Sequence, residues 1–251
     1  MKKNLHITLV QANLYWENKS LNLTHFDSLI SEIEDTDIIL LPEMFNTSFC
    51  PQSNHFAEPM DGKTVRWMKL KSKENNCSIA GTLMVYENNK VYNRLVWVSK
   101  NGTINTYDKY HLFSLASEEK YISKGSKRLI IDERGWKICP LICYDLRFPV
   151  FSRNNVDYDI LIYLANWPSR RIDAWETLIK ARAIENQSVT IGVNRIGKDG
   201  NGTLFNGRSL AFDPFGVQIC STRDNKEEVK TMILEKEIPN YILNFDIKST
   251  P

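Results

Sequence analysis

Short, uninterrupted runs of apolar residues most constrain the fold of this chain. Residues 37–41 and 159–164 each begin with Asp and continue with apolar or aromatic side chains only. Such a run is far too short for a membrane span and is typical of a parallel strand that is buried on both faces. Helical patterns lie between these runs. The alternation predicts an α/β protein in which helices cover the sheets.

The rest of the chain continues this alternation. Helices are predicted over 20–33, 61–74 and 172–187, each with apolar residues on one face. Strands are predicted over 5–11, 37–41, 78–85, 91–99, 128–131, 136–142, 159–164, 189–194, 208–212, 217–221 and 228–235. No linker, repeat or low-complexity stretch interrupts the pattern. We therefore expect one domain over residues 1–251, built as a layered sandwich of mixed sheets and helices.

The composition excludes several classes of protein. The chain has 251 residues, of which 42% are hydrophobic, and 32 Lys and Arg nearly balance 30 Asp and Glu. These values are ordinary for a globular protein, so a disordered or collagen-like chain is excluded. The balanced charge offers no basic surface for nucleic acids or anionic membranes, and no apolar run approaches the roughly 18 residues of a membrane span. Neither nucleic acid nor a membrane is expected as a partner.

Cysteine usage and the first residues indicate a compartment. The five cysteines are scattered and odd in number, which is typical of free thiols in a reducing environment. Cys139 and Cys143 lie four apart without a second Cys or His pair, so no metal site is expected. The chain enters its first strand pattern without the apolar stretch of a signal peptide. We expect a cytoplasmic protein.

Three segments present side chains that can take part in catalysis. The segments 40–45, 107–113 and 141–149 are each expected to end a buried strand, and they carry Glu43, Lys109 and Cys143. Open α/β sheets gather their sites at the carboxyl ends of strands. A carboxylate can take the proton of a thiol, and an ammonium group can stabilise the oxyanion that forms when the sulfur attacks a carbonyl. Together the three side chains indicate acyl transfer.

Each of these residues also has a purely structural interpretation. Free cysteine is among the most buried residue types, so Cys143 fits a small core side chain. Glu43 and Lys109 equally fit an ordinary ion pair at a sheet edge. Residue types and spacing leave both interpretations open.

Eight segments, in order along nearly the whole chain, resemble the nitrilase superfamily of carbon–nitrogen hydrolases. They are 9–11, 41–45, 108–113, 142–149, 165–168, 181–187, 192–195 and 213–216. The resemblance implies an α-β-β-α sandwich that dimerises into a four-layer αββα–αββα core and uses neither cofactor nor metal. By motif, Glu43 resembles the general base, Lys109 the lysine that stabilises the oxyanion, and Cys143 the nucleophile.

Many members of this superfamily have a second glutamate between the lysine and the cysteine. Here Glu118 and Glu119 are the candidates. Glu118 stands seven residues before Gly125, the spacing expected of that glutamate, and is therefore preferred. Either residue also fits a solvated charge on a loop.

Part of the chain resembles the bacterial omega-amidase branch of the superfamily. The segments concerned are 143–149, 165–168 and 199–202. Omega-amidases hydrolyse the terminal amide of short 2-oxo acids such as 2-oxoglutaramate and 2-oxosuccinamate. Because such substrates are anions, we expect the guanidinium of Arg147 to bind their carboxylate. Arg147 would instead brace the fold if it paired with Asp145 or Glu185.

Three further residues are expected around the substrate. The backbone N–H of Tyr144 would join Lys109 in stabilising the oxyanion. Phe45 and Trp167 are candidates for the walls of the pocket, although large aromatic residues at strand ends also fit the core. Whether the loop 113–125 closes over the site is left open.

Two alternatives to an omega-amidase remain at this point. The same three catalytic residues would serve a nitrile hydrolase, an N-carbamoyl amino acid hydrolase or another aliphatic amidase. A non-catalytic binding subunit is the other alternative, although all three catalytic positions are filled. For a live site, we expect a low pKa to make Cys143 the fastest of the five cysteines to react with iodoacetamide.

Overall fold

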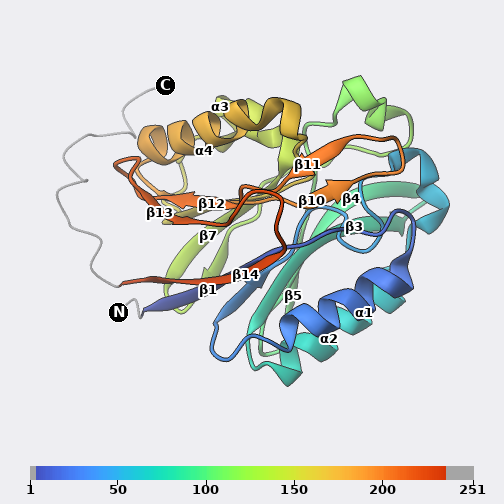
Figure 1. Cartoon of the computed structure of the whole chain (residues 1–251), viewed down its shortest axis with the longest axis horizontal. Coiled ribbons are helices and arrows are strands. Elements are labelled where there is room, and N and C mark those ends of the chain that lie inside the picture. The colour runs from blue at the N-terminus through green and yellow to red at the C-terminus, as the bar shows by residue number, and fades with distance from the viewer. Residues whose placement is uncertain (1–3, 236–251) are drawn as a thin grey trace.

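Two six-stranded mixed sheets pack face to face at the centre of the molecule. The computed structural model describes residues 4–235, so residues 1–3 and 236–251 of the predicted domain lie outside the described part. Figure 1 shows the two sheets between two layers of helices. The predicted α-β-β-α sandwich is confirmed.

The first sheet has the strand order β14-β1-β2-β3-β4-β5. Its strands are β1 (Leu5–Gln11), β2 (Ile38–Leu40), β3 (Ser78–Glu87), β4 (Lys90–Val98), β5 (Ile104–Asp108) and β14 (Glu228–Leu234). Strands β1, β2 and β3 are parallel, while β4, β5 and β14 each run antiparallel to their neighbours. Two reversals separate β3 from β5. The carboxyl ends of β2 and β5 therefore lie at the same edge.

The second sheet has the order β13-β12-β9-β8-β7-β6 and the same mixed design. Its strands are β6 (Ile131–Glu133), β7 (Trp136–Ile142), β8 (Ile160–Leu164), β9 (Val189–Val193), β12 (Leu210–Phe212) and β13 (Gln218–Ser221). Strands β7, β8 and β9 are parallel. A separate hairpin joins β10 (Ile196–Lys198) to β11 (Leu204–Asn206).

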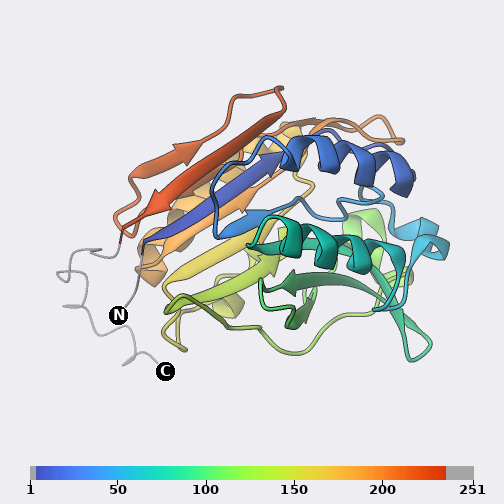
Figure 2. The ribbon, with the colours of Figure 1, turned by 90° about the horizontal axis from the view of Figure 1, so that it is seen from below.

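Helices cover the outer face of each sheet. The first sheet carries α1 (Lys19–Ile30) and α2 (Lys63–Glu74), which lie side by side in Figure 2. The second sheet carries α3 (Pro149–Ser152) and α4 (Ile172–Asn186). Within residues 4–235, no helix is both long and apolar enough to cross a membrane.

Alternating side chains of the first sheet supply two cores. Leu5, Ile7 and Leu9 of β1 point between the sheets, and Val10 points outward toward the helices. The second sheet is buried on both faces, because α4 packs on its outer side. At Gly192 of β9 an added Cβ would lie 2.4 Å from the Trp175 ring of α4, so only glycine lets the helix approach this closely.

Most predicted elements match the observed ones within one or two residues, and the strand 136–142 coincides with β7. The strand predicted over 128–131 is wrong, because β6 begins at Ile131. A turn with positive φ at Arg134 and Gly135 sets this register, and Asp132 accepts a hydrogen bond from the Gly135 N–H at 2.9 Å. The predicted strand ranges do not include β5 or the short strands β10 and β11.

Candidate active site

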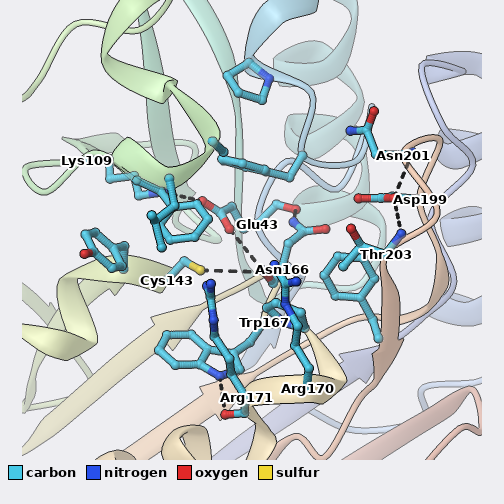
Figure 3. Close-up of a pocket in the computed structure, with 18 of the residues that line it drawn as sticks. Glu43, Lys109, Cys143, Asn166, Trp167, Arg170, Arg171, Asp199, Asn201 and Thr203 are labelled. Atoms are coloured by element: carbon cyan, nitrogen blue, oxygen red, sulfur yellow. Dashed lines mark hydrogen bonds and ion pairs between the residues drawn. The ribbon is translucent and has the colours of Figure 1, made fainter.

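Four segments from both sheets converge at one edge of the sandwich. Glu43 follows β2 and Lys109 follows β5, both in the first sheet. In the second sheet, Cys143 directly follows β7 and Asn166 follows β8. Figure 3 shows the four side chains facing one another. The structure thus brings the predicted carboxylate, ammonium and thiol together, since these strands end at the same edge.

Glu43 and Lys109 form a buried ion pair. The Lys109 Nζ lies 2.8 Å from Glu43 Oε1, and both side chains are almost completely buried. Asn93 Nδ2 donates to the same oxygen at 2.9 Å, and the backbone N–H of Asn166 donates to Glu43 Oε2 at 2.9 Å. Both carboxylate oxygens are therefore held in place. Burial to this degree distinguishes the pair from the ordinary exposed ion pair at a sheet edge.

Glu118, rather than Glu119, completes this cluster. Glu118 is fully buried, and its Oε2 lies 3.0 Å from Lys109 Nζ. The backbone N–H of Phe113 donates to the same Glu118 oxygen at 2.7 Å. Glu119 is exposed. Lys109 is thus held between two carboxylates, which fixes the position of its ammonium group.

Cys143 adopts an uncommon backbone conformation. Its φ is +40°, in the left-handed region that residues with a Cβ rarely adopt. The residue is only 9% exposed, and its Sγ lies 3.9 Å from the backbone oxygen of Asn166. Strain of this kind persists only where the surroundings enforce it, and it clusters at functional sites.

Burial and nearby charges set the protonation of the cluster. Burial alone would lower the pKa of Lys109. The carboxylates of Glu118 and Glu43 raise this pKa by more than burial lowers it, so the ammonium stays charged. Burial, together with the charge of Glu43, raises the pKa of Glu118. The same two causes raise the pKa of Cys143 well above that of an ordinary thiol, although Lys109 partly opposes them.

The expected low pKa of Cys143 is therefore wrong. Two carboxylates already face one ammonium group, and a thiolate would add a second uncompensated negative charge in a buried place. Burial and the charge of Glu43 therefore favour the neutral form of the Cys143 thiol.

A cavity of about 500 Å³ opens over the thiol. Glu43, Lys109 and Cys143 line it, as do the predicted residues Tyr144, Arg147 and Trp167. Further lining residues are Phe49, Pro51, Gln52, Phe113, Leu115, Ala116, Asn166, Pro168, Arg170, Arg171, Asp199, Asn201, Thr203 and Phe205. The loop 113–125 and the β10–β11 hairpin both contribute to this wall.

Arg147 faces the cavity and does not brace the fold as in the structural alternative. Its guanidinium lies 5.0 Å from the centre of the Trp167 ring, a cation–π distance. The Asp145 carboxylate accepts a hydrogen bond from Tyr107, and Glu185 forms an ion pair with Arg182 at 2.8 Å. Within the described chain, no carboxylate lies within ion-pair distance of Arg147.

Phe45 does not line the cavity, contrary to the prediction. The residue is fully buried, and its ring packs against Phe26 of α1 at 5.5 Å and Trp67 of α2 at 5.8 Å between centroids. The ring also fills the space beside Gly81, where a Cβ would come within 2.7 Å of it. Phe45 therefore belongs to the core between the first sheet and its helices.

Asp145 is a buried residue whose part in the site was missed from the sequence. Its carboxylate accepts hydrogen bonds from Tyr107 Oη at 2.7 Å, from the His111 N–H at 2.9 Å and from the Ile142 N–H at 3.1 Å. It therefore ties the lysine segment to the turn that carries Cys143. The only sequence signal for Asp145 is its position two residues after Cys143, where it is also a candidate partner of Arg147.

The chemistry available in this cavity is that of a thiol, a carboxylate and a buried ammonium group. Within residues 4–235, no group of three or more His, Cys, Asp or Glu side chains could hold a metal ion. A thiol beside a carboxylate can attack an electrophilic carbon, and the fixed ammonium can stabilise the negative charge that forms.

Comparisons with known proteins agree with this geometry. A family model described as carbon–nitrogen hydrolase matches residues 6–238. The omega-amidase YafV of Escherichia coli strain K12 is 44% identical over 220 residues, which cover 88% of this chain and 85% of that protein. A 2-oxoglutaramate amidase of Bacillus subtilis is 34% identical over 216 residues, covering 84% and 83%.

A solved structure has the same fold. It is the crystal structure of a carbon–nitrogen hydrolase superfamily protein from Xanthomonas campestris with an arsenic adduct in its active site. The two proteins are 36% identical, the TM-score is 0.90, and the alignment covers 93% of this chain and 91% of the other. Sequence and fold therefore both assign this chain to the carbon–nitrogen hydrolase family, the nitrilase superfamily.

Proposed function

We propose that this protein is an omega-amidase. It hydrolyses the terminal amide of short 2-oxo acids such as 2-oxoglutaramate and 2-oxosuccinamate, and it releases ammonia and the 2-oxo dicarboxylate. The observation that carries the proposal is the pairing of Cys143 with the buried Glu43–Lys109 cluster in a cavity that also presents Arg147. The similarity to an omega-amidase and a 2-oxoglutaramate amidase supports the choice of substrate.

The first half of the proposed reaction forms a thioester. Glu43 takes the proton of the Cys143 thiol as the sulfur attacks the amide carbon. This order suits a thiol whose pKa is raised, because the proton leaves only when the new bond forms. Lys109 and the backbone N–H of Tyr144 stabilise the oxyanion. The carbon–nitrogen bond then breaks, and Glu43 returns its proton to the departing ammonia.

The second half releases the acid. A water molecule attacks the thioester carbon while Glu43 takes one of its protons. The carbon–sulfur bond breaks, and the proton returns from Glu43 to the sulfur. Glu118 keeps Lys109 oriented throughout, through contacts of 3.0 and 3.2 Å to its ammonium group. Arg147 binds the substrate carboxylate, and Trp167 forms the wall on which the guanidinium rests.

Ammonia release from 2-oxoglutaramate tests the proposal. The wild type and a Cys220→Ala control should release ammonia at the same rate, since Cys220 lies in β13 outside the cavity lining. Cys143→Ala should release none while keeping the wild-type circular dichroism spectrum. Turnover by a clean Cys143→Ala preparation would rule out the mechanism. Hydrolysis of a nitrile, an N-carbamoyl amino acid or a simple aliphatic amide, but not of 2-oxoglutaramate, would rule out the substrate.

We also propose that the enzyme is a single-domain homodimer with four αββα–αββα layers. Residues from both sheets share one core, which supports the single domain. An apolar surface supports the dimer: Ile184 of α4 is 47% exposed, and Phe215 and Val217 in the turn between β12 and β13 are 55% and 58% exposed. These residues adjoin one another, because a Cβ at Gly216 would lie 2.7 Å from Ile184.

Light scattering after gel filtration tests the dimer. The expected mass is twice the 29.1 kDa of one chain, and Phe215→Asp should shift it toward one chain. A monomeric wild type at micromolar concentration would contradict the dimer.

A cytoplasmic location is part of the proposal. All five cysteines are free and buried, and free thiols persist in reducing compartments. Cell fractionation should recover the protein with cytoplasmic markers, and recovery with an extracytoplasmic fraction would overturn this part.

A further inference from the structure

Three arginines gather on one side of the cavity. Arg147 comes from the short helix η4 (Cys143–Arg147), and Arg170 and Arg171 come from η5 (Ser169–Arg171). Figure 3 shows the latter two beside Trp167. In the described part of the chain, no carboxylate lies within ion-pair distance of any of the three guanidinium groups. One wall of the cavity is therefore rich in uncompensated positive charge.

Arg171 is the more enclosed of the two arginines in η5. Its guanidinium lies 5.3 Å from the centre of the Phe113 ring, and its backbone oxygen accepts a hydrogen bond from Trp167 Nε1 at 2.8 Å. Arg171 is half-buried, while Arg170 is exposed. Phe113 thus contacts the guanidinium of Arg171, and Trp167 holds its backbone.

The surroundings of Arg171 favour an anion. Partial burial lowers the pKa of its guanidinium, and the charges of Arg170 and Arg147 lower it further. A guanidinium that is partly removed from water and close to like charges is stabilised when a carboxylate binds it. Arg171, Tyr144 and Cys143 all line the same cavity, so a short ligand can reach from the thiol to this wall.

We propose that Arg171 is a second substrate-binding arginine, which holds the carboxylate end of the substrate together with Arg147 and so determines specificity for anionic amides. This inference rests on the proposed function and extends it. The amide end lies over Cys143 while the opposite end of the molecule reaches the guanidinium groups. A neutral amide of the same length enters the cavity but gains nothing from Arg171.

Steady-state kinetics on two substrates test this assignment. Arg171→Met should lower kcat/KM for 2-oxoglutaramate by about 10- to 100-fold, the range for a lost hydrogen bond to a charged group. The same variant should hydrolyse the neutral pentanamide at the wild-type rate. Arg66→Met, a matched substitution at an exposed position of α2, should leave both rates unchanged. Arg170→Met should have a much smaller effect on 2-oxoglutaramate than Arg171→Met.

Two results would overturn the assignment. Equal losses for pentanamide and 2-oxoglutaramate would mean that Arg171 only supports the fold. Equal losses in Arg170→Met and Arg171→Met would mean that overall positive charge, and not a defined contact, attracts the anion.

A binding measurement separates this inference from the proposed function. Glutarate, a dicarboxylate of the same chain length, should slow the alkylation of Cys143 by iodoacetamide in the wild type. Arg171→Met should need about tenfold more glutarate for the same protection. An unchanged requirement would overturn the inference even for an active omega-amidase. Retained dependence on Arg171 in a protein that is inactive on 2-oxoglutaramate would overturn the substrate alone.

Discussion

At the scale of single residues, the proposed mechanism depends on the Cys143 thiol and the Glu43 carboxylate. Glu43 is held by Lys109, Asn93 and Asn166, so its oxygens keep their positions as the proton moves. The same carboxylate raises the pKa of the Cys143 thiol, which it deprotonates in the proposed mechanism. A raised pKa favours the neutral thiol, which is less open to oxidation than a thiolate.

Glu43→Gln separates these two effects. Removing the negative charge should lower the pKa of Cys143, because that charge is one of the causes that raise it. More thiolate is then present at neutral pH, yet ammonia release should fall by about 100-fold or more because the base is lost. The pH dependence of thiolate absorbance measures the first effect. Glu119→Gln, at the exposed neighbour of Glu118, is the control, and an unchanged thiol pKa in Glu43→Gln would contradict the prediction.

At the scale of elements, one buried carboxylate connects the two sheets at the site. The Asp145 carboxylate in η4 forms hydrogen bonds with Tyr107, at the end of β5, and with His111, in the segment after Lys109. The His111 ring also stacks on Phe148, with 3.6 Å between centroids. Movement of the lysine segment away from the nucleophile would therefore break several contacts at once.

Asp145→Asn should weaken this connection without changing the size of the side chain. We expect the free energy of unfolding to fall by about 1–3 kcal/mol, since buried donors lose a charged acceptor. We expect kcat to fall more than tenfold, because Lys109 and Cys143 no longer hold their relative positions. Urea denaturation and ammonia release measure the two effects. Tyr107→Phe, which removes one of these bonds, should lie between the wild type and Asp145→Asn, and wild-type kcat in Asp145→Asn would refute the positioning role.

At the scale of the whole molecule, the two sheets depend on one core. Trp97 of β4 is fully buried between the sheets, in the same cluster as Ile138 of β7 and Trp175 of α4. The active site spans this interface, with Lys109 on one side and Cys143 on the other. Separation of the sheets would therefore dismantle the site as well as the core.

Trp97→Ala should destabilise both halves together. The expected loss is about 3–5 kcal/mol of unfolding free energy for a buried tryptophan. Because the core is shared, tryptophan fluorescence and far-UV circular dichroism should report one coincident transition in denaturant. Leu70→Ala, at an exposed position of α2, should change stability little. Two separate transitions would show that the sheets unfold independently.

Much of the fold could be predicted from local patterns, and much of the site could not. Buried strands such as β8 can be predicted because every side chain in the run is apolar or aromatic. The predicted strand 136–142 has the same ends as β7. The sequence did not indicate that Asn93 binds Glu43, because the hydrogen-bond partner of a polar residue within a strand depends on the tertiary structure. Phe45 was misplaced because the same aromatic residue suits a pocket or a core, and the space beside Gly81 decided between them.

The sequence by itself determined the α/β class, the order of the main elements and the three segments that carry Glu43, Lys109 and Cys143. These follow from periodicity and motif, which are local properties of the chain. Only the tertiary structure decided that Glu118 rather than Glu119 faces Lys109, that Asp145 joins the two sheets, and that Arg171 reaches the cavity. These contacts depend on which residues, distant in the sequence, lie close together in the folded chain. Burial and the charge of Glu43 at this site also raise the pKa of Cys143.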